Sequence, residues 1–436
     1  MKKFRTTLIT LFLIFAVSSS ALANGLSLNS VGTRALGMGG AFVGLANDGS
    51  AIYWNPAGLA GQESAVMLYF TGITPMATYK NDMNPSNEID ATAISKIHTA
   101  PGLFANYTMN KWAFGLGIYV PAGLGVEWNP EDIMGPGVEG KELLSQIGVI
   151  SISPSVAYQV TDKFSLGVAV NVYYGMFDMK QPVPGGQLGV FQFDETSTGT
   201  GVGFTIGAKY DFSESFSAGV SFRTSTKVSM SGDASNGLFP NLPTIPPGVH
   251  PDYPNGLQPG PEESSFSRDV EWPMWIGGGV AYKPNDCWTI TFDGQYSQWS
   301  TLDKLTAEYD DPYWNAVMEA SGENEFDLKW EDAVQIRVGT EYMASKSIAV
   351  RLGYYYDPAP APDETLNVLF PSSTNHVATA GFGYFGEKLS VEAAVEYLFG
   401  AERDIPFDPK DPTKYSTPGK HQMDVFAFGI GLGWKF

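Results

Sequence analysis

The chain has 436 residues, of which 17% are charged and 13% aromatic, with 49 glycines and a formal charge of -20. A mean hydropathy of -0.08 excludes a bundle of apolar transmembrane helices, and the lack of any basic patch in the sequence excludes a nucleic-acid partner. This composition is typical of an outer-membrane β-barrel, whose lipid-facing and lumen-facing residues cancel on average. A large soluble β protein could share it, so the pattern along the chain has to decide.

The first 23 residues have the features of a secretory signal peptide. Three basic residues precede an apolar run over Leu8–Val17, and Ala21-Leu22-Ala23 matches an A-x-A cleavage site. The apolar run is too short to span a bilayer as a helix. We therefore expect residues 1–23 to direct export and to be removed.

Residues 24–62 form a long stretch rich in Gly and Ala that ends in Asn55-Pro56-Ala57 and alternates neither as a helix nor as a strand. Gly37-Met38-Gly39-Gly40 superficially resembles a phosphate loop, but no Lys-Ser/Thr pair follows it. The glycines favour close packing instead. We expect this segment to be a hatch, or plug, inside a barrel built by residues 63–436.

Beyond residue 62 the sequence alternates with period two, which predicts β-strands. The bulky face of the longest segments runs for about ten residues, the length needed by a tilted membrane strand. The sequence therefore predicts an all-β membrane protein, a 14-stranded antiparallel outer-membrane β-barrel plugged by the N-terminal hatch. The expected strands are 63–79, 99–110, 111–127, 145–160, 163–179, 199–211, 215–230, 266–283, 287–302, 327–343, 347–357, 375–385, 388–400 and 422–436.

Tryptophans near the expected strand ends predict an aromatic girdle at the membrane interfaces. These residues are Trp112, Trp128, Trp272, Trp288, Trp299 and Trp434. Short connections such as 160–163 and 211–214 alternate with long ones. This asymmetry places the short turns in the periplasm and the long loops outside the cell.

Two long loops carry apolar residues among Gly and Pro. They are Asn129–Leu144, with Ile133 and Met134, and Ser231–Ser265. The second loop contributes Leu238, Phe239, Leu242 and Ile245. The Pro and Gly content of the second loop is consistent with a disordered surface loop; the other interpretation is an external platform that captures apolar ligands.

The third expected strand contains Pro121 and Gly123. Because Pro cannot donate to a sheet and Gly weakens one, these residues predict a break in the wall. The break either marks the strand's end near a loop or opens a lateral gap through which an apolar molecule could enter the bilayer.

The alternation of residues along the expected strands predicts that several charged side chains face the lumen. They are Lys209, Arg223, Arg337, Glu341, Arg351, Glu392 and Glu396. We favour an internal salt-bridge network that joins hatch and wall. The alternative is that Arg223, Arg337 or Arg351 receives a ligand carboxylate.

Catalysis, a metal site and a disulfide framework are not expected. Cys287 is the single cysteine, and the four histidines lack ligand spacing. No G-x-S-x-G elbow occurs. We expect neither an enzyme nor a cofactor.

The mature N-terminus resembles the FadL/TodX family of outer-membrane transporters of hydrophobic compounds. The similarity runs through Gly25–Asn29, Gly32–Ala41, Asn47-Asp48 and Asn55–Leu59, and recurs at Gly279–Pro284, Arg351–Tyr354 and Gly381–Tyr384. The terminal Phe436 fits the outer-membrane assembly signal.

The resemblance implies capture of the ligand between two external loops, a pocket beside the hatch, and release through a lateral opening at a kinked third strand. Fatty-acid members use basic residues for the carboxylate, and none occurs at Tyr174-Gly175-Met176-Phe177. Long-chain fatty acids and neutral or aromatic hydrocarbons therefore both stay open as ligands. We expect passive uptake by a monomer surrounded by outer-membrane lipid and lipopolysaccharide. A polar-solute porin and a structural or adhesion barrel are the alternatives.

Overall fold

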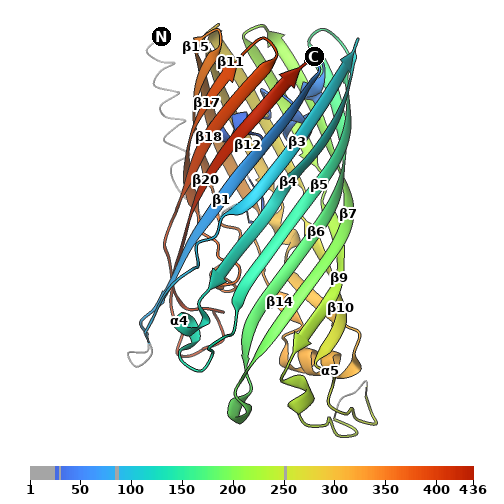
Figure 1. Ribbon diagram of the computed structural model, residues 1–436, viewed down its shortest axis with the longest axis vertical. Helices are drawn as coiled ribbons and strands as arrows, with labels where there is room; N and C mark the ends of the chain where they lie inside the picture. The colour runs from blue at the N-terminus through green and yellow to red at the C-terminus, as the bar shows by residue number, and fades with distance from the viewer. Residues whose placement is uncertain (1–24, 29–30, 84–87, 250–252) are drawn as a thin grey trace.

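The computed structural model describes residues 25–28, 31–83, 88–249 and 253–436. The expected signal peptide lies outside these residues. They form a tall antiparallel β-barrel with short turns at one end and long loops at the other (Figure 1). None of the described helices is long and apolar enough to cross a membrane.

The wall has 14 strand positions, which confirms the predicted number. In wall order the strands are β1 Ala65–Asn81, β3 His98–Met109, β4 Trp112–Trp128, β5 Leu143–Gln159, β6 Phe164–Pro184, β7 Val190–Ser213, β8 Phe216–Arg223 with β9 Thr226–Asn236, β10 Glu263–Trp272 with β11 Trp275–Asn285, β12 Trp288–Ser297, β15 Ala333–Ser345, β16 Ile348–Asp357, β17 Asn375–Phe385, β18 Leu389–Gly400 and β20 Gly419–Lys435.

Two wall strands are broken. β8 and β9 are one strand interrupted at residues 224–225, and both pair with β7. β10 and β11 are interrupted at residues 273–274, where Pro273 removes a backbone donor. The barrel closes through the pairing of β1 with β20, from Ala65 opposite Lys435 to Lys80 opposite Lys420.

The remaining elements lie in the hatch and at the long-loop end. They are the strands β2 Ile89–Thr92, β13 Lys304–Tyr309, β14 Glu325–Asp327 and β19 Arg403–Ile405, the helices α2 Thr33–Gly37, α3 Ala51–Trp54, α4 Pro130–Met134 and α5 Pro312–Ser321, and the 3-10 turns η1 Pro56–Leu59, η2 Gly186–Leu188, η3 Phe239–Asn241 and η4 Trp299–Thr301.

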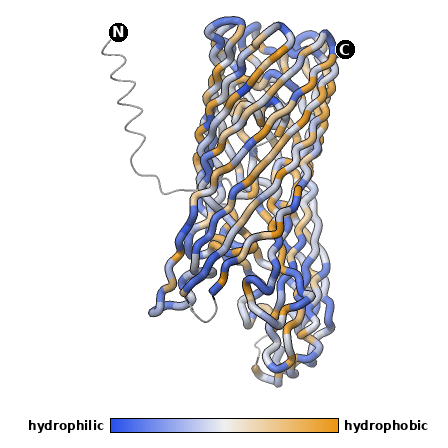
Figure 2. Tube along the Cα trace, turned by 60° about the vertical axis from the view of Figure 1, so that its left-hand side comes forward, coloured by the Kyte–Doolittle hydropathy of each residue, from blue (hydrophilic) through white to orange (hydrophobic). Residues whose placement is uncertain are grey.

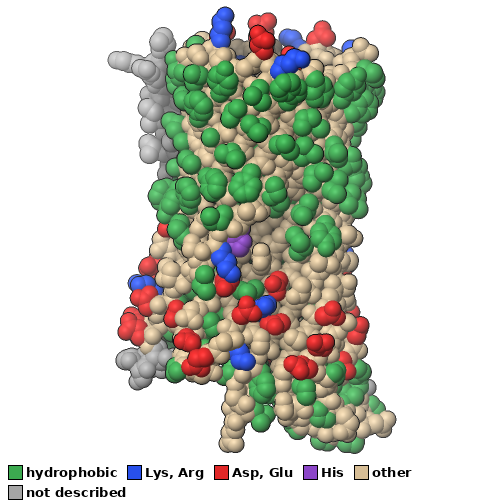
Figure 3. Space-filling model, in the orientation of Figure 1, with side chains coloured by type: hydrophobic (Ala, Val, Ile, Leu, Met, Phe, Trp, Pro, Cys, Tyr) green, Lys and Arg blue, Asp and Glu red, His purple; other side chains and the backbone are tan. Residues whose placement is uncertain are grey.

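Along the part of the wall near the short turns, most bulky side chains point outward and most inward-facing ones are small, although Tyr69, Phe104 and Tyr119 are buried. On β20, Phe426, Ile430 and Leu432 are exposed, whereas Ala427 is buried. In Figure 3 hydrophobic side chains cover the barrel from the short-turn end to about its middle, and charged side chains gather at the rim and around the long loops. The Cα trace coloured by hydropathy likewise shows many hydrophilic residues toward the long-loop end (Figure 2). The exterior is therefore an apolar belt suited to a lipid bilayer.

The predicted aromatic girdle is correct for three tryptophans and wrong for three. Trp112, Trp288 and Trp434 are exposed on the apolar belt near the short turns, but Trp128, Trp272 and Trp299 are buried in the interior. On β4 the cause is one extra residue between Tyr119 and Ala122, which moves all later side chains to the opposite face. Trp272 ends β10 on the inward face just before the break at residues 273–274, and Trp299 lies beyond the end of β12.

The described residues 31–62, which we call the hatch, fill the lumen near the short turns (Figure 1). Nearly all of their side chains are buried. The hatch backbone lies directly on wall glycines: a Cβ added at Gly167, Gly219 or Gly353 would come within 3.0 Å of hatch backbone atoms. The small inward face of the wall strands is thus what leaves room for the hatch.

Candidate functional site

The wall is interrupted between β3 and β4. Their pairing starts at Met109 opposite Trp112 and ends at Leu103 opposite Ile118. The next hydrogen bond across this seam runs from the Ile94 N–H to the Glu127 carbonyl, at 2.7 Å. Between these two points the described part of β4 pairs only with β5 on the wall, which leaves a gap in the sheet that we call the window.

A bulge in β4 lies at the window. Tyr119 faces Ser151 on β5, but the next pair is Ala122 with Val149, so β4 carries one extra residue, and Val120 and Pro121 are left without wall partners. A bulge bends its strand, and Pro has no N–H to offer to β3. These two local effects explain why β4 diverges from β3 here.

The first described residues occupy the edge of β4 that β3 leaves unpaired. The Leu28 N–H donates to the Pro121 carbonyl at 2.9 Å, and the Gly123 N–H donates to the Leu26 carbonyl at 2.8 Å. Gly25 has a positive φ of 52° and lies against Trp299 and Trp330. The N-terminal segment 25–28 therefore partly covers the window from the lumen side.

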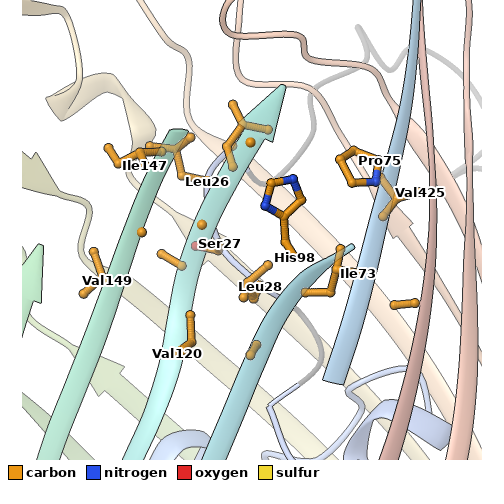
Figure 4. Close-up of a pocket in the computed structure, with 18 of the residues that line it drawn as sticks. Leu26, Ser27, Leu28, Ile73, Pro75, His98, Val120, Ile147, Val149 and Val425 are labelled. Atoms are coloured by element: carbon orange, nitrogen blue, oxygen red, sulfur yellow. The ribbon is translucent and has the colours of Figure 1, made fainter. Parts of the chain in front are cut away.

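A cavity of about 550 Å³ lies at the window, which is within the usual range for small-molecule sites. Figure 4 shows its apolar part. Leu26 and Leu28 of the N-terminal segment line it together with side chains from β1, β4 and β5. Its lining includes Ile118 and Met176, which are exposed on the lipid side, and Tyr355, which is fully buried. The cavity thus extends from the lipid-facing surface of the gap into the lumen.

His98 stands at the window on β3 (Figure 4). Its ring lies against Gly125 of β4, where an added Cβ would come within 3.0 Å of the imidazole. No other basic side chain of the described residues lines this cavity. Sequence reasoning passed over His98 because it considered histidines only as metal ligands or catalytic bases.

Polar side chains from β16, β17, β18 and the loop before β17 line another part of the cavity. The lining includes Asp357, Glu396, Asn375 and Ser372, all buried. The Tyr355 hydroxyl donates to Glu396 Oε2 at 3.1 Å, and Gln335 Nε2 donates to Asp357. The alternation along its strand predicted that Glu396 faces the lumen, and Asp357 is the last residue of β16. Only the tertiary structure places both side chains at one cavity.

The three arginines proposed for a ligand carboxylate all contact the hatch or the hatch-binding network, and none of them lines the large cavity. Arg223 donates to the Tyr53 carbonyl at 2.9 Å, and Arg337 donates to the Gly39 carbonyl at 3.1 Å. Arg351 Nε donates to Glu341 at 2.7 Å. Arg223 also borders a separate cavity of about 20 Å³, roughly the room for one water molecule.

An ion-pair network joins hatch and wall and includes Glu341, Arg351 and Glu392 of the predicted lumen charges, together with a hatch residue that sequence reasoning had not named. Arg34 of α2 makes a two-pronged contact with Glu341 of β15, at 2.7 and 2.9 Å. Arg351 contacts the same carboxylate and lies 3.6 Å from Glu392. Two guanidinium groups thus share one buried carboxylate.

The Asn55-Pro56-Ala57 motif lies at the wall formed by β6, β7 and β8. Asn55 Nδ2 donates to the carbonyls of Val43 and Ala208, both at 3.1 Å, and Oδ1 accepts from the Ala57 N–H. Asn55 therefore joins two parts of the hatch to β7. Pro56 starts η1 and its backbone lies against Gly167.

The residues proposed for ligand capture divide into two groups. Leu238 and Phe239 are buried, and the Phe239 ring packs on Trp314 of α5 with centroids 4.3 Å apart. Ile133, Leu242 and Ile245 are partly exposed, and Met134 is 37% exposed. In Figure 1 the helix α4 and the loop beside α5 lie on different sides of the long-loop end.

The loop beside α5 is a packed structure. The Tyr313 hydroxyl donates to the Pro243 carbonyl at 2.7 Å, and the Trp314 indole donates to the Pro261 carbonyl at 2.8 Å. Burial raises the pKa of Tyr313, so the hydroxyl stays a donor at neutral pH. The interpretation of this region as a disordered loop is wrong for the described residues around α5.

Comparisons with known proteins agree with this architecture. A family model described as "Outer membrane protein transport protein (OMPP1/FadL/TodX)" matches residues 14–436. A long-chain fatty acid transport protein of Escherichia coli O6:H1 is 23% identical over 88% of this chain and 89% of its own length. Outer membrane protein P1 of Haemophilus influenzae is 22% identical over 100% of both chains.

Two solved structures share the fold. A FadL homologue from Pseudomonas aeruginosa aligns with a TM-score of 0.76 and 18% identity, over 94% of this chain and 100% of that one. The toluene transporter TodX of P. putida aligns with a TM-score of 0.73 and 16% identity, over 93% of this chain and 98% of that one.

Proposed function

The chain belongs to the OMPP1/FadL/TodX family of outer membrane transport proteins, and on that basis we propose that it takes up hydrophobic small molecules passively and releases them sideways through the window. The family transports hydrophobic compounds across the bacterial outer membrane and does not consist of enzymes. The ligand classes we consider are long-chain fatty acids and neutral or aromatic hydrocarbons.

The observation that carries the proposal is the continuity between the window and the apolar cavity. The lining takes residues from both sides of the seam, such as Pro101 on β3 and Val120 on β4, together with lumen residues such as Val425. An apolar molecule in this cavity would reach the bilayer without crossing the polar headgroups of the outer leaflet. Burial of its surface in lipid would drive the last step, so no energy source is needed.

We assign first contact with the ligand to the long-loop end. Leu238 and Phe239 would form the rigid base of this platform because they are buried beside α5. Met134, Ile133, Leu242 and Ile245 keep exposed surface that an apolar molecule could touch. The cavity at the window would receive the ligand next, after movement of the N-terminal segment 25–28 off β4.

A polar-solute porin fits the geometry less well. A porin needs a continuous water-filled lumen, whereas the buried hatch lies directly on the wall glycines. A large single-channel conductance of the purified protein in a planar bilayer would favour the porin and contradict uptake through the window. A purely structural or adhesion barrel would give cells no gain in uptake of labelled apolar compounds.

The test of lateral release is to bridge the window chemically. After Cys287→Ser, which removes the exposed native thiol, Pro101→Cys and Val120→Cys place one thiol on each side of the gap. A short bis-maleimide linker that joins them should reduce uptake of a labelled apolar compound at least tenfold in cells.

The matched control joins the same two strands on the short-turn side of the window, where they are paired. Ala105 and Leu116 are direct partners in the β3–β4 ladder, so Ala105→Cys with Leu116→Cys should crosslink without blocking the gap. Both crosslinked barrels should keep the heat-modifiable gel mobility of a folded barrel. Normal uptake by a fully bridged window would contradict lateral release.

A further inference from the structure

The polar part of the cavity presents mainly hydrogen-bond acceptors. Asp357 and Glu396 contribute two carboxylates, buried to 4% exposure each, and Asn375 contributes an amide at 3% exposure. The amide orientation is set by its Nδ2, which donates to the Ser373 carbonyl at 3.0 Å. Asn375 Oδ1 is consequently the atom left to accept a further hydrogen bond.

That acceptor is unsatisfied. Among the described residues, Asn375 Oδ1 is buried and has no hydrogen-bond partner, and the same is true of Ser372 Oγ in the same cavity. A buried acceptor without a donor is unfavourable, since it lost its bonds to water on folding. A ligand that brings an O–H group into this part of the cavity would supply the missing donor.

The charge in this region is more negative than positive. Arg337 lies over the Tyr355 ring at 4.6 Å and donates to Gln335 Oε1 at 2.5 Å, and Gln335 in turn donates to Asp357. Arg337 does not line the cavity, whereas both carboxylates do. A ligand carboxylate placed here would meet like charges and would bring no donor.

We propose that this cavity selects apolar molecules whose polar end donates a hydrogen bond, such as long-chain alcohols or alkylphenols, over carboxylates of the same chain length. The proposal rests on the proposed uptake function and narrows its ligand class. The alkyl or aryl part would lie among the apolar residues at the window, and the hydroxyl would donate to Asn375 Oδ1 or to a carboxylate oxygen of Asp357 or Glu396.

The test measures equilibrium binding of three labelled probes to the purified protein at pH 8, namely 1-dodecanol, dodecanoate and dodecane. Each affinity is corrected for the partition of that probe into protein-free detergent micelles, so that different probes can be compared in wild type, and each probe is also compared between wild type and variants. We expect dodecanol to bind wild type at least tenfold more tightly than dodecanoate. In Asp357→Asn/Glu396→Gln, dodecanoate should gain about tenfold while dodecane changes less than twofold.

Two further variants keep the result interpretable. Asn375→Leu removes the unsatisfied acceptor and should weaken dodecanol about tenfold while leaving dodecane within twofold. Asp269→Asn removes a carboxylate from an exposed ion pair away from the cavity and should leave the dodecanol-to-dodecanoate ratio unchanged. If the double variant does not fold, Glu396→Gln alone should still shift the ratio at least threefold.

The outcomes separate this inference from the proposed function. Tight dodecanoate binding that equals or exceeds dodecanol binding would overturn the inference, as would a ratio that does not change in the cavity variants. Loss of dodecanoate binding in His98→Gln would locate a carboxylate site at the window and would also overturn it. Failure of all three probes, dodecane included, to bind wild type would instead contradict uptake of apolar molecules.

Discussion

Gly167 of β6 and Pro56 of the hatch are in direct backbone contact, because a Cβ added at Gly167 would come within 3.0 Å of the Pro56 carbonyl group. The hatch is therefore held by shape as well as by hydrogen bonds. Wall glycines on β8 and β16, Gly219 and Gly353, meet the hatch backbone in the same way.

Gly167→Val should displace the Asn55-Pro56-Ala57 end of the hatch without unfolding the barrel. Backbone cannot move aside as a flexible side chain does, and overpacking a tight contact costs about 1–3 kcal/mol or more. We expect cells that carry this variant to become several-fold more sensitive to a bulky hydrophilic antibiotic.

Gly294→Val is the matched control for Gly167→Val, because a Cβ at Gly294 of β12 meets nothing within 4 Å. Its antibiotic sensitivity should equal that of wild type. Unchanged sensitivity in Gly167→Val, in a barrel with normal heat-modifiable mobility, would show that the glycine contact does not hold the hatch.

Arg34→Ala should loosen the hatch through loss of its ion pair with Glu341. Removing one partner of a buried pair costs about 3–5 kcal/mol, and here Arg351 still neutralises Glu341, so we expect about 2–3 kcal/mol. Hydrogen exchange of the hatch amides, followed by mass spectrometry, should accelerate accordingly.

Lys227→Ala tests whether the Arg34 effect depends on burial. Lys227 and Asp269 form an ion pair whose side chains are 61% and 51% exposed, and such pairs contribute about 0–1 kcal/mol. Exchange of the hatch amides should not change in this variant. Equal effects of both substitutions would contradict a role for the buried network.

Gly125→Leu should obstruct the window. Its side chain would occupy the space of the His98 ring, which lies within 3.0 Å of the added Cβ. Uptake of labelled apolar compounds should fall at least fivefold in this single variant. Adding His98→Ala should restore part of that uptake because it returns the lost volume. No recovery in the double variant would mean that Gly125 acts through the β4 backbone.

Leu352→Arg should destabilise the barrel from its lipid-facing side. Leu352 is 62% exposed on the apolar belt, and an arginine in the bilayer interior of a β-barrel costs about 2–4 kcal/mol. Urea unfolding in lipid vesicles measures this loss.

Glu387→Arg, in the short turn between β17 and β18, should cost less than about 1 kcal/mol because it lies at the interface. Equal losses at both positions would argue against membrane burial of the belt.

The wall could be predicted from the sequence because strand alternation is a local property. Each of the 14 wall positions corresponds to a predicted segment, and the bulky face is the exposed one. The sequence also predicts a weak point in β4 at Pro121 and Gly123, since both residues weaken a sheet by themselves, but it does not predict which neighbouring strand β4 leaves there.

The errors came from events that shift register. Trp128 is sixteen residues after Trp112, so regular alternation puts both on the lipid face, yet the bulge at residues 120–121 turns Trp128 inward. One extra residue in a strand leaves the composition unchanged, and a scan for alternating hydrophobic residues does not reveal where that residue lies.

By itself, the sequence determined an outer-membrane barrel, its lipid-facing side and a glycine-rich segment to fill it, because these depend on residue type and period along one strand. Only the tertiary structure decided where the wall opens and which charges meet. The β3–β4 gap depends on the divergence of two strands, and Arg34 reaches Glu341 across 307 residues of chain. Such contacts are set by closure of the whole barrel, which joins residues that no local pattern relates.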